Sequence, residues 1–169
     1  MSTTCFNVAR LWLMCQPCYN KLMKSYELSE QDMQLWYMWK GSYQRIFERV
    51  INELTEHTGL SEGDYGVLDR LDLLGNGCLR QQELADSMKW DKSRLSHHLT
   101  RMEKRGLVAR KPLDTERGVQ VVITSTGELA LGEARPVVSR AIRKHFLDQL
   151  TVQDRELIAK LAGRAKESI

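Results

Sequence analysis

Long apolar runs are missing from this sequence of 169 residues. A helix needs ~20 consecutive apolar residues to span a bilayer, and no stretch of the chain reaches that length. Residues 6–14 lean apolar, but Arg10 interrupts them and no small-residue cleavage pattern follows. We therefore expect no membrane span and no signal peptide, and we expect the protein in the cytoplasm.

Cysteine is also scarce, with four residues at positions 5, 15, 18 and 78. Cys15 and Cys18 form a C-x-x-C pair, a spacing found in redox centres and in half zinc sites. No second C-x-x-C or H-x-x-x-H follows to complete a tetrahedral metal site. Free thiols are the favoured interpretation, and Cys15, Cys18 and Cys78 stay as candidates for a redox role.

The signatures of catalysis are missing too. The chain has no phosphate-binding loop, no cluster of metal ligands and no pairing of a nucleophile with a base. His97 and His98 are adjacent, but neighbouring residues on a helix point about 100° apart and do not readily share one metal ion. We predict that the protein is not an enzyme and holds no metal or cofactor.

Charge is unevenly distributed although the net charge is only +3. Residues 89–118 hold nine Lys/Arg and four Asp/Glu, a net charge of +5, whereas residues 27–88 hold five Lys/Arg and twelve Asp/Glu, a net charge of −7. One concentrated basic block in a weakly basic chain is typical of a local phosphate-binding surface. A solvated helix face would give the same charge count. Charge alone therefore does not distinguish the two interpretations, and the sequence motifs are needed to do so.

The apolar spacing predicts a mainly helical chain with a small β-hairpin. Residues 1–27 show no pattern that we can interpret. Amphipathic helices are predicted over residues 32–57 and 61–74, the second with Leu74 on its buried side, and over 81–88, 91–105 and 125–150, with a last helix from 151. Short strands are predicted at 78–80, 107–110 and 119–124. This order places a helix-turn-helix before a two-stranded wing.

The helix at 91–105 carries the candidate DNA contacts. With Asp91 as its cap, Leu95, Leu99 and Met102 share one arc that must face the core. The opposite face has no carboxylate and presents hydroxyl, imidazole and cationic groups, which suit phosphates and the base edges of the major groove. The candidate recognition residues are Lys92, Ser93, Arg94, Ser96, His97, Thr100, Arg101 and Lys104.

The loop of the predicted hairpin adds a second candidate surface. It carries Arg110, Lys111 and Arg117, with Asp114 between them. An arginine at a hairpin tip can enter the narrow minor groove of A·T-rich DNA, and Asp114 can hold the tip in shape. A merely polar loop is the alternative.

The stretch from 84 to 124 resembles the MarR (multiple antibiotic resistance regulator) family of winged helix-turn-helix transcription regulators. The resemblance rests on Ser93-Arg94-Leu95-Ser96, on Arg101-Met102-Glu103, on Lys104-Arg105-Gly106-Leu107-Val108, and on Asp114-x-x-Arg117-Gly118 followed by Ile123-Thr124-x-x-Gly127. The family's wing motif is commonly Asp-x-Arg. Here two residues separate Asp114 from Arg117, which puts the role of Asp114 in question more than that of Arg117.

The resemblance implies a homodimer on palindromic double-stranded DNA. Residues 28–58 and 125–169 would be the dimerisation helices, around a winged helix-turn-helix lobe at 59–124. Many members are repressors that a small aromatic or phenolic acid releases from DNA, while others sense oxidants through cysteine. Trp36, Trp39, Tyr43 and Arg45 are candidates for such a ligand pocket, although dimer or core packing explains the two tryptophans better.

Two alternatives remain beside a ligand-released repressor. A redox-sensing regulator would use Cys15, Cys18 or Cys78, although a buried structural thiol is the favoured interpretation of Cys78. A winged helix that binds protein instead of DNA would present an apolar outer face on the third helix of the lobe, whereas the face here is polar and cationic.

Overall fold

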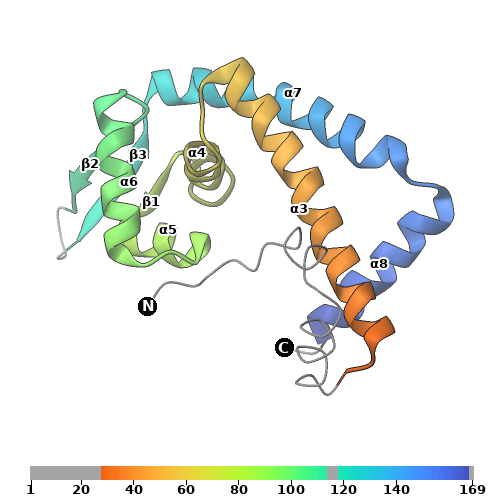
Figure 1. The fold of residues 1–169 in the computed structure, drawn as a ribbon. Coiled ribbons are helices and arrows are strands. Elements are labelled where there is room, and N and C mark those ends of the chain that lie inside the picture. The colour runs from red at the N-terminus through yellow and green to blue at the C-terminus, as the bar shows by residue number, and fades with distance from the viewer. Residues whose placement is uncertain (1–27, 114–117, 168–169) are drawn as a thin grey trace, which may run out of the picture. The chain divides into compact units, whose positions relative to one another are not determined.

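The computed structural model of this chain describes residues 28–113 and 118–167. Its helices are α3 (Glu30–Thr58), α4 (Glu62–Gly75), α5 (Gln81–Met88), α6 (Lys92–Lys104), α7 (Ser125–His145) and α8 (Val152–Glu167), with a 3-10 turn η1 (Leu147–Gln149). Its strands are β1 (Cys78–Arg80), β2 (Val108–Pro112) and β3 (Val119–Ile123). The predicted mainly helical class with a small β wing is confirmed (Figure 1).

The boundary between two compact units falls after Glu48, inside α3. In the part of the first unit that the structure describes, α3 begins after Ser29, whose Oγ accepts a bond of 3.1 Å from the backbone N–H of Asp32. Beyond this cap, the apolar side chains of the helix lie mostly in solvent. Leu35, Trp36, Met38, Trp39 and Tyr43 are each more than half exposed.

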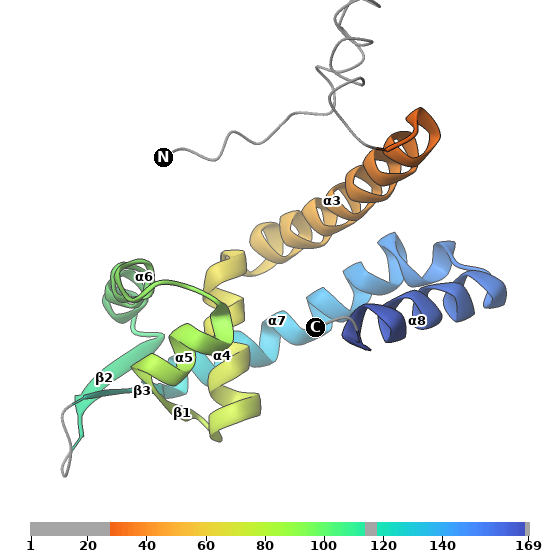
Figure 2. The same ribbon diagram turned by 90° about the horizontal axis from the view of Figure 1, so that it is seen from below.

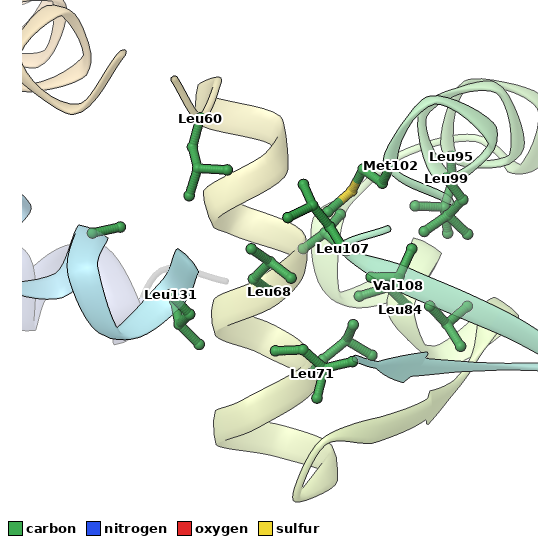
Figure 3. Close-up of a cluster of buried hydrophobic side chains, with 14 of the residues drawn as sticks. Leu60, Leu68, Leu71, Leu84, Leu95, Leu99, Met102, Leu107, Val108 and Leu131 are labelled. Carbon is green, nitrogen blue, oxygen red and sulfur yellow. The ribbon is translucent and has the colours of Figure 1, made fainter. Parts of the chain in front are cut away.

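The second unit has one hydrophobic core centred on α4 (Figure 3). Leu68 and Leu71 of α4 share this core with buried side chains from α5, α6, the turn before β2, the sheet and α7: Leu84, Leu95, Leu99, Met102, Leu107, Val108, Val121 and Leu131. Full burial of a leucine side chain stabilises a fold by about 1.5–3 kcal/mol. This shared core therefore fixes α6 firmly against α4 and the sheet.

The sheet is antiparallel and has the order β1-β3-β2. Val108 pairs with Ile123 and Pro112 pairs with Val119, so β2 and β3 form the predicted hairpin. Cys78 pairs with Val122, which adds the predicted short strand on the outer side of β3. In both views α6 and the hairpin lie at the same end of the second unit (Figures 1 and 2).

The start of α7 explains the pattern Ile123-Thr124-x-x-Gly127. Thr124 Oγ1 accepts a bond from the backbone N–H of Gly127 and donates to the carbonyl of Gly106. A Cβ on Gly127 would come within 2.1 Å of the carbonyl oxygen of Leu107, so only glycine allows this approach. The N-cap is therefore Thr124, directly before the helix that was predicted to begin at residue 125.

The exposure of one residue and the bounds of two elements differ from the predictions. Leu74 is 63% exposed, because the chain turns out of α4 at Asn76 in the left-handed conformation and only one side of the helix meets the core. The strand β2 begins at Val108 and extends to Pro112, since its pairing with β3 continues to Val119. The helix α7 ends at His145, followed by η1, and does not reach 150.

The end of α7 is fastened to the second half of α3. Glu53 Oε1 accepts from Lys144 Nζ at 2.8 Å and lies 2.5 Å from His145 Nε2. These two bonds lower the pKa of Glu53 to about 2.

After η1 the chain continues into α8, on which Val152 and Leu157 are more than half exposed. Among residues 28–113 and 118–167, no helix is both long and apolar enough to cross a membrane.

Candidate nucleic-acid interface

The helix α6 is oriented by its cap and its apolar side. The backbone N–H of Arg94 donates to Asp91 Oδ1 at 2.8 Å, which confirms the predicted cap. Leu95, Leu99 and Met102 are completely buried, as the helical wheel requires. The opposite side of the helix is therefore turned away from the core. Of the eight predicted recognition residues, Lys92, Ser93, Arg94, His97, Arg101 and Lys104 are exposed, and Ser96 and Thr100 are half-buried.

This outward side carries positive charge that no carboxylate on it offsets. The acid within α6 is Glu103, and its carboxylate is engaged by Arg110 of β2. Glu103 Oε1 accepts from the backbone N–H of Arg110 and Oε2 accepts from its Nε, both at 2.8 Å. The side-chain bond from Arg110 chiefly holds the pKa of Glu103 below its usual range. Lys92, Arg94, Arg101 and Lys104 are left as a cationic face, on which no ion pair with a carboxylate is found among the described residues.

Arg110 and Thr100, both predicted as DNA contacts, are bonded to each other. Arg110 Nη2 donates to Thr100 Oγ1 at 3.0 Å, and Thr100 Oγ1 donates in turn to the carbonyl of Ser96 at 3.0 Å. Together with Glu103, these groups join the base of the wing to α6. DNA contact by either residue stays a prediction, and in this structure their visible role is to hold the two surfaces together.

The wing itself is described only at its base. Lys111 is exposed on β2, and the backbone N–H of Leu113 donates to the carbonyl of Gly118 at 3.3 Å, which closes the loop. Asp114 and Arg117 lie outside the described residues, so their predicted roles remain predictions.

A buried polar cluster behind α6 was missed by the sequence analysis. Asp64 of α4 is buried and accepts from the backbone N–H of Ser61 at 3.0 Å and from Arg105 Nη1 at 2.6 Å. Burial acts to raise the pKa of Asp64, but the bonds from Ser61 and Arg105 outweigh it and the pKa is lowered. His98 of α6 is buried beside this carboxylate.

The spacing Ser61-x-x-Asp64 was the available signal for half of this cluster, since it forms a reciprocal capping box. No local pattern indicated that Arg105, 41 residues away, also binds Asp64. Arg105 additionally donates to the carbonyl of Gly59 at 3.0 Å, so the end of α6 is fastened to the start of α4.

The candidate ligand-pocket residues lie on α3 in the first unit. Trp36, Trp39 and Tyr43 are 54–62% exposed, and Tyr43 stacks on Phe47 with ring centroids 5.8 Å apart. Arg45 Nη2 lies 3.4 Å from Ser42 Oγ on the same helix. The described residues of this unit leave the aromatic rings open to solvent, and the pocket stays a prediction.

The candidate redox residue Cys78 is half-buried on β1, and burial raises the pKa of its thiol. A raised pKa keeps the thiol protonated and slow to react with oxidants. Cys15 and Cys18 lie outside the described residues. In the described part of the chain, no three His, Cys, Asp or Glu side chains are grouped to hold a metal ion.

Comparison with known proteins identifies the fold. Residues 60–117 match the sequence model of the MarR family. AbsC, a MarR family transcriptional regulator from Streptomyces coelicolor, is 27% identical with a TM-score of 0.75 over 85% of this chain and 97% of its own. Sco3205, a MarR family regulator from the same organism solved in complex with DNA, is 26% identical with a TM-score of 0.76 over 85% and 91%.

A third structure shares the fold at lower identity. It is an organohalide-sensing transcriptional regulator in its 2,4-dichlorophenol-bound form, 21% identical with a TM-score of 0.70 over 84% of this chain and 83% of its own. Among proteins with curated functions, none matches this sequence.

Proposed function

Residues 60–117 form a domain of the MarR family within a chain that has the fold of MarR family transcription regulators, and from this premise we propose that the protein binds palindromic double-stranded DNA as a homodimer. The observation that carries the proposal is the cationic outer face of α6. Its four Lys and Arg residues stand on a helix that the core and the Asp91 cap hold rigidly. A rigid helix with such a face fits the major groove.

In this proposal the residues of α6 divide by position. Arg94 and Arg101 are long enough to reach guanine O6 and N7, while Lys92, Lys104 and the hydroxyl of Ser93 suit phosphates. Ser96 and His97 reach base edges or phosphates near the middle of the helix. The wing follows the DNA outward, with Lys111 on the backbone and Arg117 in the minor groove, and Asp114 shapes the tip.

Dimerisation is supported by apolar side chains that a single copy leaves in solvent. They occur on α3 in the first unit and on α8 in the second. A second copy of the chain that covers them would remove this exposed apolar surface from water. Residues 28–58 and 125–169 would then be the dimerisation helices, with residues 59–124 as the DNA-binding lobe and residues 1–27 as an extension of unassigned role.

We further propose that the protein is a cytoplasmic repressor released by a small aromatic ligand. The organohalide-sensing regulator of the same fold was solved with a chlorinated phenol. The exposed rings of Trp36, Trp39 and Tyr43, with the cation of Arg45 nearby on α3, provide aromatic and anion-binding groups for a phenolic acid. The raised pKa of Cys78 disfavours the redox alternative at that residue.

Selection of bound DNA from a random duplex pool tests the proposal. A palindrome with half-sites about one helical turn apart is expected, with release by phenolic acids and no effect of peroxide. Failure to enrich any sequence would reject the DNA-binding assignment. Release by peroxide alone would replace the ligand mechanism with the cysteine one.

A further inference from the structure

His98 lies on the recognition helix but faces away from its outer side. It is 8% exposed, and its ring lies against the first turn of α4. A Cβ on Gly63 would come within 2.7 Å of His98 Cε1 and 3.0 Å of Trp90 Cη2. The missing side chain at Gly63 is therefore what makes room for both rings.

The two rings hold the two exposed arginines of α6. Arg101 Nη2 lies 2.9 Å from His98 Nδ1. The guanidinium carbon of Arg94 lies 4.2 Å from the centre of the Trp90 ring, a cation–π contact. Trp90 and His98 meet edge to face, with centroids 5.2 Å apart and an interplanar angle of 78°. Arg94, Trp90, His98 and Arg101 thus form one continuous chain of contacts.

We propose that His98, with Trp90, is a positioning residue that aims Arg101 and Arg94 and so sets the base preference of the recognition helix. The inference rests on the proposed function, because it assumes that α6 enters the major groove. A guanidinium reads guanine through two bonds of fixed geometry, so its discrimination depends on how well its plane is oriented before contact. An arginine already bonded to a buried ring loses less freedom on binding.

The protonation state of the ring follows from the donors around it. A guanidinium only donates, so Nδ1 of His98 accepts from Arg101 and carries no proton. In the neutral ring the proton is then on Nε2, which lies 3.1 Å from Asp64 Oδ1. This contact is close enough for charge attraction but is not aligned as a hydrogen bond, and Nε2 has no other partner. The Asp64 carboxylate is meanwhile held by Ser61 and Arg105.

Protonation would convert the acceptor at Nδ1 into a donor and break the bond to Arg101. The charged groups that face the ring are Asp64 from α4, which favours the protonated form, and Arg94 and Arg101 from α6, which oppose it. Burial is the largest influence, and the pKa of His98 lies below its usual value. The orienting bond is therefore intact at neutral pH and is lost on acidification.

Two substitutions separate positioning from packing. His98→Asn places an amide oxygen close to the position of Nδ1 and does not titrate, whereas His98→Leu fills similar space without an acceptor. Wild type, both variants and the control His57→Gln, an exposed histidine outside the lobe, are titrated at fixed salt with the DNA selected by wild type. The same titrations use that DNA with one guanine changed in each half-site.

With His98→Leu, discrimination between the two DNAs is expected to fall about 10-fold, the scale of one bidentate arginine–guanine contact, while affinity for random-sequence DNA changes less than about 2-fold. His98→Asn and His57→Gln are expected to keep the discrimination of wild type. As the pH is lowered from neutral to well below the usual histidine pKa of about 6.5, discrimination is expected to fall for wild type and His57→Gln and to stay flat for His98→Asn. The exposed His97 is present in all four proteins, so any contribution that it makes is common to them.

Gly63→Ala gives an independent variant if His98→Leu does not fold. It displaces the His98 ring while leaving the sequence of α6 unchanged. Discrimination is expected to fall with Gly63→Ala as well. Unchanged discrimination with a folded His98→Leu or Gly63→Ala would overturn the positioning role while leaving DNA binding intact. Failure of wild type to select any DNA would instead reject the proposed function itself.

Discussion

Arg110 on β2 and Glu103 on α6 form the link between the base of the wing and the recognition helix. Glu103 accepts from the backbone N–H and from Nε of Arg110, and the same guanidinium also reaches Thr100. The two side chains are 27% and 28% exposed, so water screens the pair only in part. These bonds join the base of the wing to the recognition helix.

Breaking this link is expected to lower stability. Glu103→Ala removes charge-assisted bonds and should lower the free energy of unfolding by about 1–3 kcal/mol. Glu103→Gln keeps an acceptor for the backbone N–H of Arg110 and should cost less. Urea denaturation of both variants, of Arg110→Ala and of the double variant Glu103→Ala/Arg110→Ala measures the coupling. Costs of Glu103→Ala and Arg110→Ala that add within about 0.5 kcal/mol would show that the pair is not coupled.

Asp64 is expected to be more sensitive to substitution than the exposed acid two residues before it. Asp64→Asn removes a buried charge that Ser61 and Arg105 satisfy, and about 1–3 kcal/mol of stability should be lost. Glu62→Gln is the matched control, since Glu62 is exposed in the same first helical turn, and it should change stability by less than about 0.5 kcal/mol. Equal urea midpoints for the two variants would contradict this account of the cluster.

The contact of Glu53 with Lys144 and His145 predicts a stability change in acid. The pKa of Glu53 in the folded protein is about 2, below its ordinary value of 4.5. The unfolded chain therefore binds more protons between these values, and the contribution of Glu53 is present above pH 4.5 and lost as the pH falls toward 2. Thermal unfolding of wild type and Glu53→Gln across pH 2–6 measures it. The stability difference between them should shrink on acidification, and a constant difference would reject the contact.

The sequence predicted the features of α6 that depend on local spacing. The cap at Asp91 and the buried triad Leu95, Leu99 and Met102 follow from successive steps of three or four residues, and both were confirmed. The burial of His98 could not be predicted in this way. It depends on Gly63, 35 positions earlier, where the absence of a Cβ opens the space.

Dependence on residues far away in the sequence also explains why features of the wing and of the helix ends were not predicted. Arg110 is of a residue type that contacts DNA, which is why it was predicted as a contact. Its bonds to Glu103 depend on how β2 packs on α6. Leu74 continues an apolar stripe but is 63% exposed, because only one side of α4 meets the core. Patterns of spacing predict which face is apolar, and they do not predict how far a partner element covers it.

A charged side chain on α8 is expected to separate the proposed dimer. Leu157 is 54% exposed, and a second copy would cover it in the proposed assembly. Leu157→Glu would bury an unpaired carboxylate there, at a cost that favours monomers. Loss of the dimer also uncouples the two half-sites, so affinity for the palindrome should fall about 100-fold or more. Light scattering and a DNA titration measure the two effects.

Leu74→Glu is the matched control, because Leu74 is a leucine of similar exposure on α4, outside the proposed dimer surface. It should remain dimeric and bind the palindrome as wild type does. If both variants stay dimeric, α8 is not part of the dimer interface. If both become monomeric, added negative charge and not the covered surface accounts for the result. Only separation by Leu157→Glu alone assigns the exposed apolar side of α8 to a second copy of this chain.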